Sequence, residues 1–288
     1  MPKLENPADP HDKLSPELDV ISQRLVKARG NAESLPDFPG SLPTTMERAY
    51  AIQSASIARW PDKISGWKVG MVPEIFRALL GAERLCGPIF QSSVCTIEAG
   101  ASRVMPIFNG GFAAVEAEFV FQLSDSIEPS NKHYSDEELI ERVGALYVGA
   151  EIASSPLTDV NKLGPCCVVS DFGNNAGLVV GPEVENWTTR SLDSLTAEVI
   201  IDGVVVGAAS ADAIEGGLLQ ALRFLVVLCA KRQLTLAAGT YVSTGAVTGI
   251  HEVNSNSRAT VNFGTQGAFD VAFQIMTPGQ LHGSMATR

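Results

Sequence analysis

Two glutamates separated by one residue lie inside an apolar segment, and their spacing suits them to metal chemistry. Residues 115–123 read Val-Glu-Ala-Glu-Phe-Val-Phe-Gln-Leu, which alternates as a β-strand does. The alternation places Glu116 and Glu118 on one face, about 7 Å apart along the strand. Two like charges this close repel each other, and burying either one without a partner costs several kcal/mol. The segment is therefore either an exposed edge strand with two solvated glutamates or part of a site for a divalent cation, which prefers oxygen ligands.

A third glutamate and a lysine lie in short segments that could bring them to the same site. Glu151 is surrounded by small and apolar residues in Gly-Ala-Glu-Ile-Ala, where the ordinary role of a glutamate is an ion pair. With Glu116 and Glu118 it suits an octahedral Mg²⁺ or Mn²⁺ site that keeps positions for water and substrate. Lys68 lies in Gly-Trp-Lys-Val-Gly-Met. Such a lysine is usually at the surface, but beside a metal it can transfer protons or bind an anion.

The composition of the chain excludes several classes of function. The 288 residues carry a net charge of −11 and are 45% hydrophobic, so the chain can bury a sizeable core. The pI near 4.8 argues against nucleic acids and membranes as partners, because both select clustered lysine and arginine. The most apolar run, residues 218–230, is too short to span a bilayer. The polar N-terminus and five cysteines without framework spacing predict a reduced, cytoplasmic protein.

The first sixty residues predict helices. Residues 1–13 are rich in proline and charge and predict a loose tail. Ser15, which is followed by a proline, is a helix-start signal. Thr44 opens a capping-box pattern, which predicts a second helix that ends near Trp60. We therefore predict an N-terminal tail and helical cap over residues 1–63.

Strand signals dominate the rest of the chain. Short β-branched and aromatic runs alternate with Gly, Pro and Asn, and Asp202-Gly203 predicts a hairpin turn. Helices are predicted at about residues 136–145, after a capping box that starts at Ser135, and at about 213–232. Many strands with few helices indicate an α+β fold. Residues 64–288 are predicted to form a mixed β catalytic domain.

Five motifs occur in an order that resembles one known family. They are Ala49-Tyr50-Ala51-Ile52-Gln53, Gly66-Trp67-Lys68-Val69-Gly70, Val115-Glu116-Ala117-Glu118 with the later Ala150-Glu151-Ile152, Ser170-Asp171 through Gly181, and Leu236 through Ile250. The set resembles the 2-keto-4-pentenoate hydratase branch of the fumarylacetoacetate hydrolase superfamily and covers roughly residues 45–255. The resemblance implies a rolled mixed β-sheet core, like the C-terminal part of fumarylacetoacetate hydrolase, with an N-terminal helical cap.

The resemblance also implies roles for individual residues. Glu116, Glu118 and Glu151 match the three acids that hold a divalent metal, Mg²⁺ or Mn²⁺, to which the C1 carboxylate and C2 oxygen of the substrate chelate. Lys68 matches the family lysine that transfers protons or binds the substrate carboxylate. Asp171 matches a segment that lines or supports the pocket and is a catalytic candidate with Lys68.

Three further positions complete the predicted site. Ser243 and Thr244 form a turn that matches a pocket segment, so with the lysine they are predicted to bind substrate. His251 follows the Thr-Gly-x-x-Thr-Gly stretch and is a candidate general base, although most lone histidines are structural. Residues 84–87 read Arg-Leu-Cys-Gly and lack the acid that many hydratases carry in the loop after the lysine strand. The missing acid affects the identity of the substrate more than the binding of the metal.

The resemblance implies a hydratase, a lyase that adds water to a 2-hydroxy-2,4-dienoate or 2-oxo-4-enoate in aromatic or sterol catabolism. Three other functions stay open: a 2-oxo-acid decarboxylase of oxalocrotonate type, an acylpyruvate C–C hydrolase, and a non-catalytic partner subunit. The missing acid at residues 84–87 favours the partner subunit. We expect a small 2-oxo or 2-hydroxy acid as substrate and a homo-oligomer as the assembly, and a complex with a decarboxylase or aldolase of the same pathway stays open.

Overall fold

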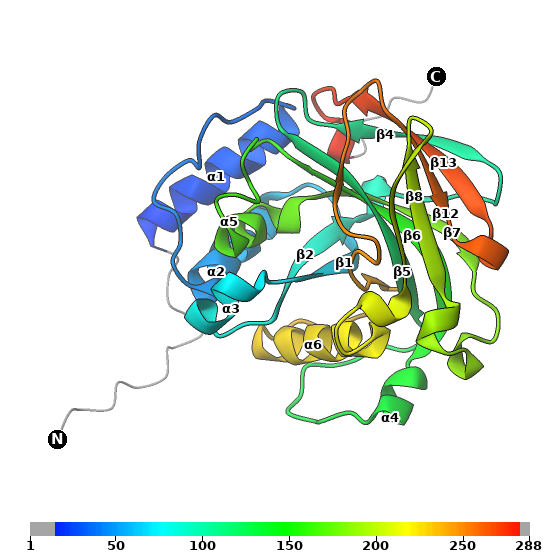
Figure 1. Cartoon of the computed structure of the whole chain (residues 1–288). Helices are drawn as coiled ribbons and strands as arrows, with labels where there is room; N and C mark the ends of the chain where they lie inside the picture. Colours follow the sequence, from blue (N-terminus) through cyan, green and yellow to red (C-terminus); the bar gives the residue numbers. More distant parts are fainter. Residues whose placement is uncertain (1–14, 283–288) are drawn as a thin grey trace.

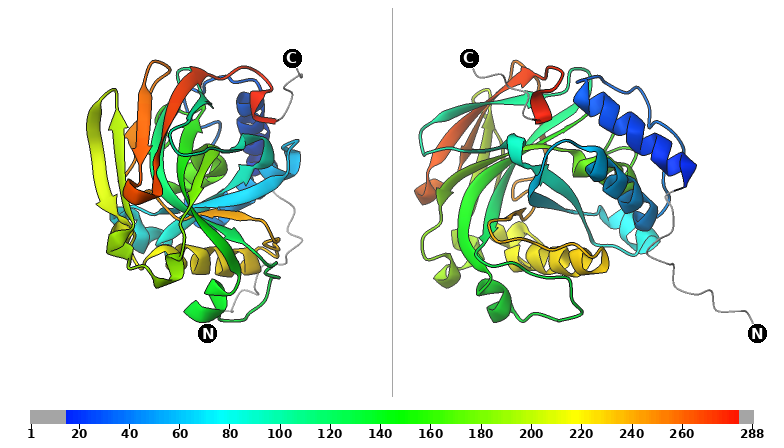
Figure 2. Two further views of the ribbon diagram at one scale, coloured as in Figure 1. Left: turned by 90° about the vertical axis from the view of Figure 1, so that its right-hand side faces the viewer. Right: turned by 180° about the vertical axis from the view of Figure 1, so that it is seen from behind.

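Two β-sheets share one apolar core (Figures 1 and 2). The computed structural model describes residues 15–282, so the tail predicted for residues 1–13 lies outside the described range. The ring of Phe119, in the larger sheet, meets the ring of Phe263, beside the smaller sheet, edge-on with 5.5 Å between centroids. The arrangement confirms the predicted α+β fold with a rolled mixed β-sheet core.

The larger sheet carries the predicted chemistry. It has eight strands in the order β2-β1-β10-β5-β6-β7-β3, with β11 pairing to β5. They are β1 (Ile64–Met71), β2 (Arg84–Phe90), β3 (Val94–Thr96), β5 (Phe112–Leu123), β6 (Val143–Ser155), β7 (Asn175–Glu183), β10 (Tyr241–Ser243) and β11 (His251–Glu252). β1 is parallel to β10 and antiparallel to β2, whereas β5 is antiparallel to both β10 and β6. The sheet is therefore mixed in direction.

The smaller sheet has five strands in the order β4-β13-β12-β8-β9. They are β4 (Ser102–Ile107), β8 (Thr196–Ile201), β9 (Val204–Ser210), β12 (Arg258–Asn262) and β13 (Ala268–Ile275). Asp202 and Gly203 both have positive φ and form the predicted hairpin turn between β8 and β9.

Helices surround the sheets. Within residues 15–282 they are α1 (Pro16–Gly30), α2 (Met46–Arg59), α3 (Glu74–Leu80), α4 (Asp136–Ile140), α5 (Pro165–Ser170) and α6 (Leu218–Lys231). α1 packs against α2, and α2 packs against α5. Figure 1 shows these three helices on the side of the molecule away from β12 and β13. No helix in the described range is both long and apolar enough to cross a membrane.

The N-terminal helices begin close to their predicted starts. The hydroxyl of Ser15 accepts a hydrogen bond from the amide of Leu18, as expected for an N-cap. The second prediction is wrong by one residue: the N-cap of α2 is Thr45 and not Thr44, because the Thr45 hydroxyl accepts the amide of Arg48 at 3.3 Å. The division of the chain after residue 63 into a cap and a catalytic domain stays a prediction.

Two other sequence-based assignments are corrected by strand pairing. The helix predicted over residues 136–145 has its capping box but ends at Ile140, because Val143 and Ala145 already pair with β5. Residues 84–87 lie in β2 and not in a loop, and all four are buried. In both places the hydrogen bonds of the sheet override the local pattern.

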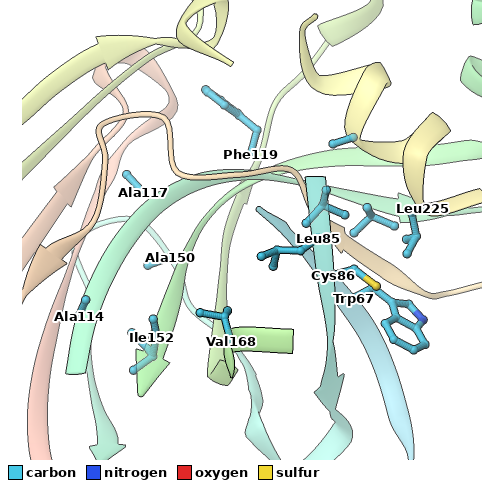
Figure 3. Packing of buried hydrophobic residues seen from close by; sticks show 14 of the residues in the cluster. Trp67, Leu85, Cys86, Ala114, Ala117, Phe119, Ala150, Ile152, Val168 and Leu225 are labelled. Carbon is cyan, nitrogen blue, oxygen red and sulfur yellow. The ribbon is translucent and has the colours of Figure 1, made fainter. Parts of the chain in front are cut away.

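The strand that carries Glu116 and Glu118 is interior. β5 pairs with β10 and β11 on one side and with β6 on the other. The alternative of a solvated edge strand is therefore wrong. Figure 3 shows Ala117 and Phe119 of this strand among the residues of the main apolar cluster. Apolar neighbours thus fix the strand that presents the two carboxylates.

Candidate metal centre

Three glutamates converge from two neighbouring strands. Glu116 of β5 lies directly opposite Glu151 of β6 in the antiparallel register, and Glu118 follows two residues along β5. One carboxylate oxygen from each residue lies within 4.8 Å of the others. The side chains are almost entirely buried, with exposed fractions of 4% for Glu116 and 0% for the other two. Burial of three like charges in one place demands a compensating cation.

Two of the glutamates keep an oxygen without a partner. Within the described range, Oε1 of Glu116 and Oε1 of Glu118 accept no hydrogen bond, whereas Oε2 of Glu151 is paired with the ammonium of Lys68 at 3.4 Å. The second oxygen of Glu118 accepts the Ser243 hydroxyl and, at 2.9 Å, the amide of Gly245. A cluster of oriented carboxylates with open oxygens and a fixed second shell is the donor set of a hard divalent cation.

Glu151 is oriented by an asparagine that sequence reasoning did not single out. Asn175, the first residue of β7, donates to Oε1 of Glu151 at 3.0 Å. Its backbone carbonyl in turn accepts Nη1 of Arg29 at 2.9 Å. The carboxylate of Glu151 is thus held through β7 by the first helix.

A buried lysine lies beside these acids. Nζ of Lys68 is 3.4 Å from Oε2 of Glu151, and the lysine side chain is 6% exposed. Burial alone lowers the pKa of Lys68, but the charges of Glu151 and Glu116 outweigh it and raise the pKa above its ordinary value. Burial raises the pKa of Glu116 to about 7, opposed by the charge of Lys68. One ammonium does not balance the negative charge of three carboxylates, so a cation can also bind there.

A cavity of about 370 Å³ opens onto this site. Lys68 and Glu116 are among its lining residues, and so are side chains from other parts of the chain: Arg77, Arg84, Asn161, Asn174, Glu215 and Thr244. The volume suits a small organic acid. The cavity therefore joins the candidate metal centre to a space of substrate size.

The predicted Ser243 and Thr244 both lie at this centre but in different ways. The Ser243 hydroxyl donates to Glu118, so this residue orients a glutamate. The Thr244 hydroxyl donates to the carbonyl of Phe119 at 2.8 Å, and the residue lines the cavity. Thr244 is therefore the one of the pair that faces the space for substrate.

Asp171 lies in a buried ion pair away from the cavity-lining residues. Its carboxylate accepts Nε of Arg29 at 2.6 Å and Nη2 at 2.8 Å, and it also accepts the Ser155 hydroxyl at 2.6 Å. Both members of the pair are almost fully buried. The contact joins α1 to the turn that follows α5, and the catalytic role of Asp171 stays a prediction.

His251 also lies outside the set of cavity-lining residues. Its Nε2 is 3.0 Å from the hydroxyl of Thr248. The ring packs so closely on Gly207 of β9 that a Cβ there would lie 2.6 Å from it. Burial lowers the pKa of His251. Within residues 15–282 the structure gives this histidine no carboxylate partner.

Comparisons with known proteins identify the fold. No protein-family model and no curated protein matches the chain. 4-Oxalocrotonate decarboxylase from Pseudomonas putida G7, complexed with magnesium and adipate, matches with a TM-score of 0.73 at 21% identity, over 89% of this chain and 97% of that one. A protein from Yersinia pestis CO92 assigned to the fumarylacetoacetate hydrolase family gives 0.54 at 11% identity, over 74% and 94%. The chain has the fumarylacetoacetate hydrolase superfamily fold.

A further structure of this fold holds a different ligand pair. Fumarylpyruvate hydrolase from Pseudomonas aeruginosa, in complex with Mn²⁺ and pyruvate, matches with a TM-score of 0.52 at 15% identity, over 75% of this chain and 91% of that one. The superfamily fold thus accompanies different reactions on small carboxylic acids in these proteins. The site itself must indicate the reaction in this chain.

The fumarylacetoacetate hydrolase fold brings residues to the cavity that sequence reasoning missed. Asn161, Asn174 and Arg84 all line it. One local signal was available: Phe172-Gly173-Asn174-Asn175 is a run typical of a left-handed turn. Residues 84–87 were interpreted only as a stretch that lacks an acid. No local pattern could show that these three positions meet.

Proposed function

We propose that the chain is a divalent-metal-dependent enzyme that acts on a small 2-oxo acid. The observation that carries the proposal is a set of three buried glutamates with carboxylate oxygens that accept no hydrogen bond. They lie beside Lys68 at a cavity of substrate size. Glu116, Glu118 and Glu151 would hold Mg²⁺ or Mn²⁺. When bound, the cation would polarise the C2–O bond of the substrate as a Lewis acid. The structures of similar fold with Mg²⁺ and adipate and with Mn²⁺ and pyruvate support this assignment.

Lys68 supplies the positive charge that the protein itself places at this site. Its ammonium lies 3.4 Å from Oε2 of Glu151, and the residue lines the cavity. It can therefore contact the carboxylate or the C2 oxygen of a bound 2-oxo acid. The neighbouring carboxylates raise the pKa of Lys68, so its ammonium form is favoured at neutral pH while no cation is bound. In this form it favours negative charge on the substrate and can deliver a proton.

Within this class we propose hydration of a 2-hydroxy-2,4-dienoate or 2-oxo-4-enoate. The reaction adds the oxygen of water to one alkene carbon and a proton to the other, with no change of redox state. Neutral polar groups of Asn161, Asn174 and Thr244 line the cavity and suit a bound water. A C–C hydrolase calls for a histidine paired with a carboxylate, and His251 contacts Thr248 instead. These observations support the hydratase over the hydrolase.

Decarboxylation of a dicarboxylic 2-oxo acid is the second candidate, favoured by two arginines. Arg84 and Arg77 line the same cavity. Arg84 is only 3% exposed and donates to the backbone carbonyl of Glu215. It has no carboxylate ion pair within the described range, so its guanidinium can bind a second substrate carboxylate. Adipate, a dicarboxylate, occupies the decarboxylase of similar fold. In this reaction the C–C bond to the departing carboxylate would break, and CO₂ would leave. The electrons of that bond would pass to the C2 ketone, and a proton would take the place of CO₂ on the carbon that carried it.

Substrate turnover by the purified protein separates these candidates. The protein is stripped with a chelator, reloaded with Mg²⁺ or Mn²⁺, and incubated with 2-hydroxypenta-2,4-dienoate, oxalocrotonate or an acylpyruvate. Loss of enol absorbance with formation of a hydroxy acid supports hydration, and CO₂ release supports decarboxylation. Turnover that persists after complete metal removal would contradict the proposed class. Turnover only after addition of a pathway decarboxylase or aldolase would identify a partner subunit.

We also propose that the enzyme is a cytoplasmic homo-oligomer that serves aromatic or sterol catabolism. This part rests on the family resemblance of the sequence. Sedimentation of the purified chain tests the assembly, and growth of a deletion strain on aromatic and sterol carbon sources tests the pathway.

A further inference from the structure

Asn174 is a buried residue that lines the cavity and has one polar atom without a hydrogen-bond partner. The residue is 2% exposed and lines the cavity together with Lys68 and Glu116. Its amide nitrogen donates to Oδ1 of Asn161 at 3.4 Å. Its own Oδ1 has no hydrogen-bond partner within the described range. A buried acceptor without a donor costs about 1–3 kcal/mol, so a donor is expected to reach it from the cavity.

The turn that carries Asn174 is held in a fixed and unusual conformation. Phe172, Gly173 and Asn174 all have φ between 56° and 66°, the left-handed region that is unfavourable for phenylalanine. The Phe172 ring is anchored by Trp60 and Phe90, at centroid distances of 5.6 Å and 5.1 Å. The asparagine therefore cannot relax toward other partners by a simple loop movement.

The same turn lies against the Lys68 side chain and against the neighbouring strand β2. A Cβ on Gly87 of β2 would lie 2.0 Å from the carbonyl oxygen of Phe172, and a Cβ on Gly173 would lie 3.1 Å from Cδ of Lys68. Both glycines are needed for this close approach. The turn that carries Asn174 thus packs against Lys68, which would contact the reacting end of a substrate.

The chemistry of the open atom restricts its ligand. An amide oxygen only accepts hydrogen bonds, so its partner must carry an O–H or N–H group. The carboxylate and ketone of a 2-oxo acid are acceptors only, and the enol hydroxyl of a 2-hydroxydienoate becomes that ketone before water adds. Water and an alcohol hydroxyl are the donors that occur before and after hydration of an alkene.

We propose that Asn174, supported by Asn161, binds the donor hydroxyl of the hydration reaction: the attacking water before the step and the new substrate hydroxyl after it. This assignment rests on the proposed hydratase function and adds the residue that orients the nucleophile. Asn174 stays neutral throughout and accepts no proton. The oxygen that it holds bonds to the alkene carbon, the proton lost from that oxygen leaves to solvent, and one proton is added to the adjacent carbon.

The test variants respect the left-handed backbone. Asn174→Gly removes the amide but keeps the favourable φ, and Asn174→Asp keeps an acceptor oxygen of the same shape. Asn186 provides a matched control, because it is also left-handed, with φ of 54°, and it lies outside the residues that line this cavity. Asn186→Gly should therefore reproduce any general effect of the substitution.

Equilibrium binding to the Mn²⁺-loaded protein is the first measurement. We compare 4-hydroxy-2-oxopentanoate with 2-oxopentanoate, which lacks the hydroxyl, by calorimetry. The wild type and Asn186→Gly should bind the hydroxy acid several-fold to about tenfold more tightly, and Asn174→Gly should bind both acids equally. Asn174→Asp should keep the preference. An unchanged preference in Asn174→Gly overturns the proposal.

Kinetics provide the second measurement. Asn174→Gly should slow water addition to 2-hydroxypenta-2,4-dienoate about 100-fold while ketonisation, followed by deuterium uptake from solvent, stays within twofold. Equal loss of both steps, or of Mn²⁺ affinity, would show a merely structural role. If the wild type does not hydrate the dienoate, the proposed function fails, and the binding comparison alone still decides the assignment of Asn174.

Discussion

Nζ of Lys68 lies 3.4 Å from Oε2 of Glu151, the same oxygen that Glu151 would offer to a cation. The ammonium and a divalent metal therefore share one carboxylate. The lysine offsets part of the negative charge of the cluster when no metal is bound. Glu116 and Glu118 also attract the ammonium, so it would have carboxylate neighbours besides Glu151 when a cation binds.

Replacement of Lys68 by methionine tests this shared arrangement. Lys68→Met should retain Mn²⁺ binding in calorimetry, because the three glutamates remain, but turnover should fall at least 100-fold. Without metal the variant should lose about 3–5 kcal/mol of unfolding free energy, because buried carboxylates lose their partner. Lys132→Met removes an exposed ion pair and an ammonium contact with the Tyr134 ring, and it should change turnover and stability little. Wild-type turnover by Lys68→Met would remove the lysine from the mechanism.

Graded loss of metal affinity should follow from substitutions around Glu151. Glu151→Gln removes a charged ligand and should weaken Mn²⁺ binding and turnover together, by more than 100-fold. Asn175→Ala removes the hydrogen bond that orients Glu151, together with one to the carbonyl of Gly177, so a loss of about 10–100-fold is expected. Calorimetric titration with Mn²⁺ measures both. Full metal occupancy with unchanged affinity in Glu151→Gln would exclude this site.

The Arg29–Asp171 ion pair predicts a change in stability. Asp171→Asn leaves the Arg29 guanidinium buried without its counter-ion and should cost about 3–5 kcal/mol of unfolding free energy. Urea unfolding at neutral pH measures it. Mn²⁺ affinity of the fraction that remains folded should stay within threefold. A large loss of turnover at unchanged stability would instead return Asp171 to the catalytic residues.

His251 predicts a dependence of stability on pH. Its pKa is lowered in the folded protein by burial, so the unfolded chain binds more protons as the pH falls through about 6.5. The stabilisation is therefore complete above this pH and is lost below it. His251→Gln should remove this part of the pH dependence between pH 8 and pH 5 in urea unfolding. The pH profile of turnover should not change, whereas a general base at this position would alter its acidic limb.

Sequence reasoning located the acids but could not show how they meet. Residue type and alternation indicate that Glu116 and Glu118 share one face of a strand. The register that sets Glu151 opposite Glu116 depends on pairing between β5 and β6, which no local pattern specifies. The Arg29–Asp171 ion pair was beyond reach for the same reason, because the two residues are 142 positions apart in the chain.

Local signals also gave incomplete information where two patterns compete. The turn at Asp202-Gly203 and the cap at Ser135 were predicted correctly, since each depends on the conformation of a few adjacent residues. The assignment of residues 84–87 to a loop failed because Leu85 and Cys86 are buried in the apolar core and the backbone of the segment pairs with β1. Such pairing is decided by the whole sheet.

The contacts of Arg29 have a consequence for how this chain can be altered. The guanidinium donates to the backbone of Asn175 and of Ser154 and to Asp171, so a residue from the first helix organises the turn and strand behind the glutamates. Exchange of the first thirty residues for those of a relative would fail unless a matching arginine came with them. Positions 29 and 171 are therefore expected to vary together among related sequences.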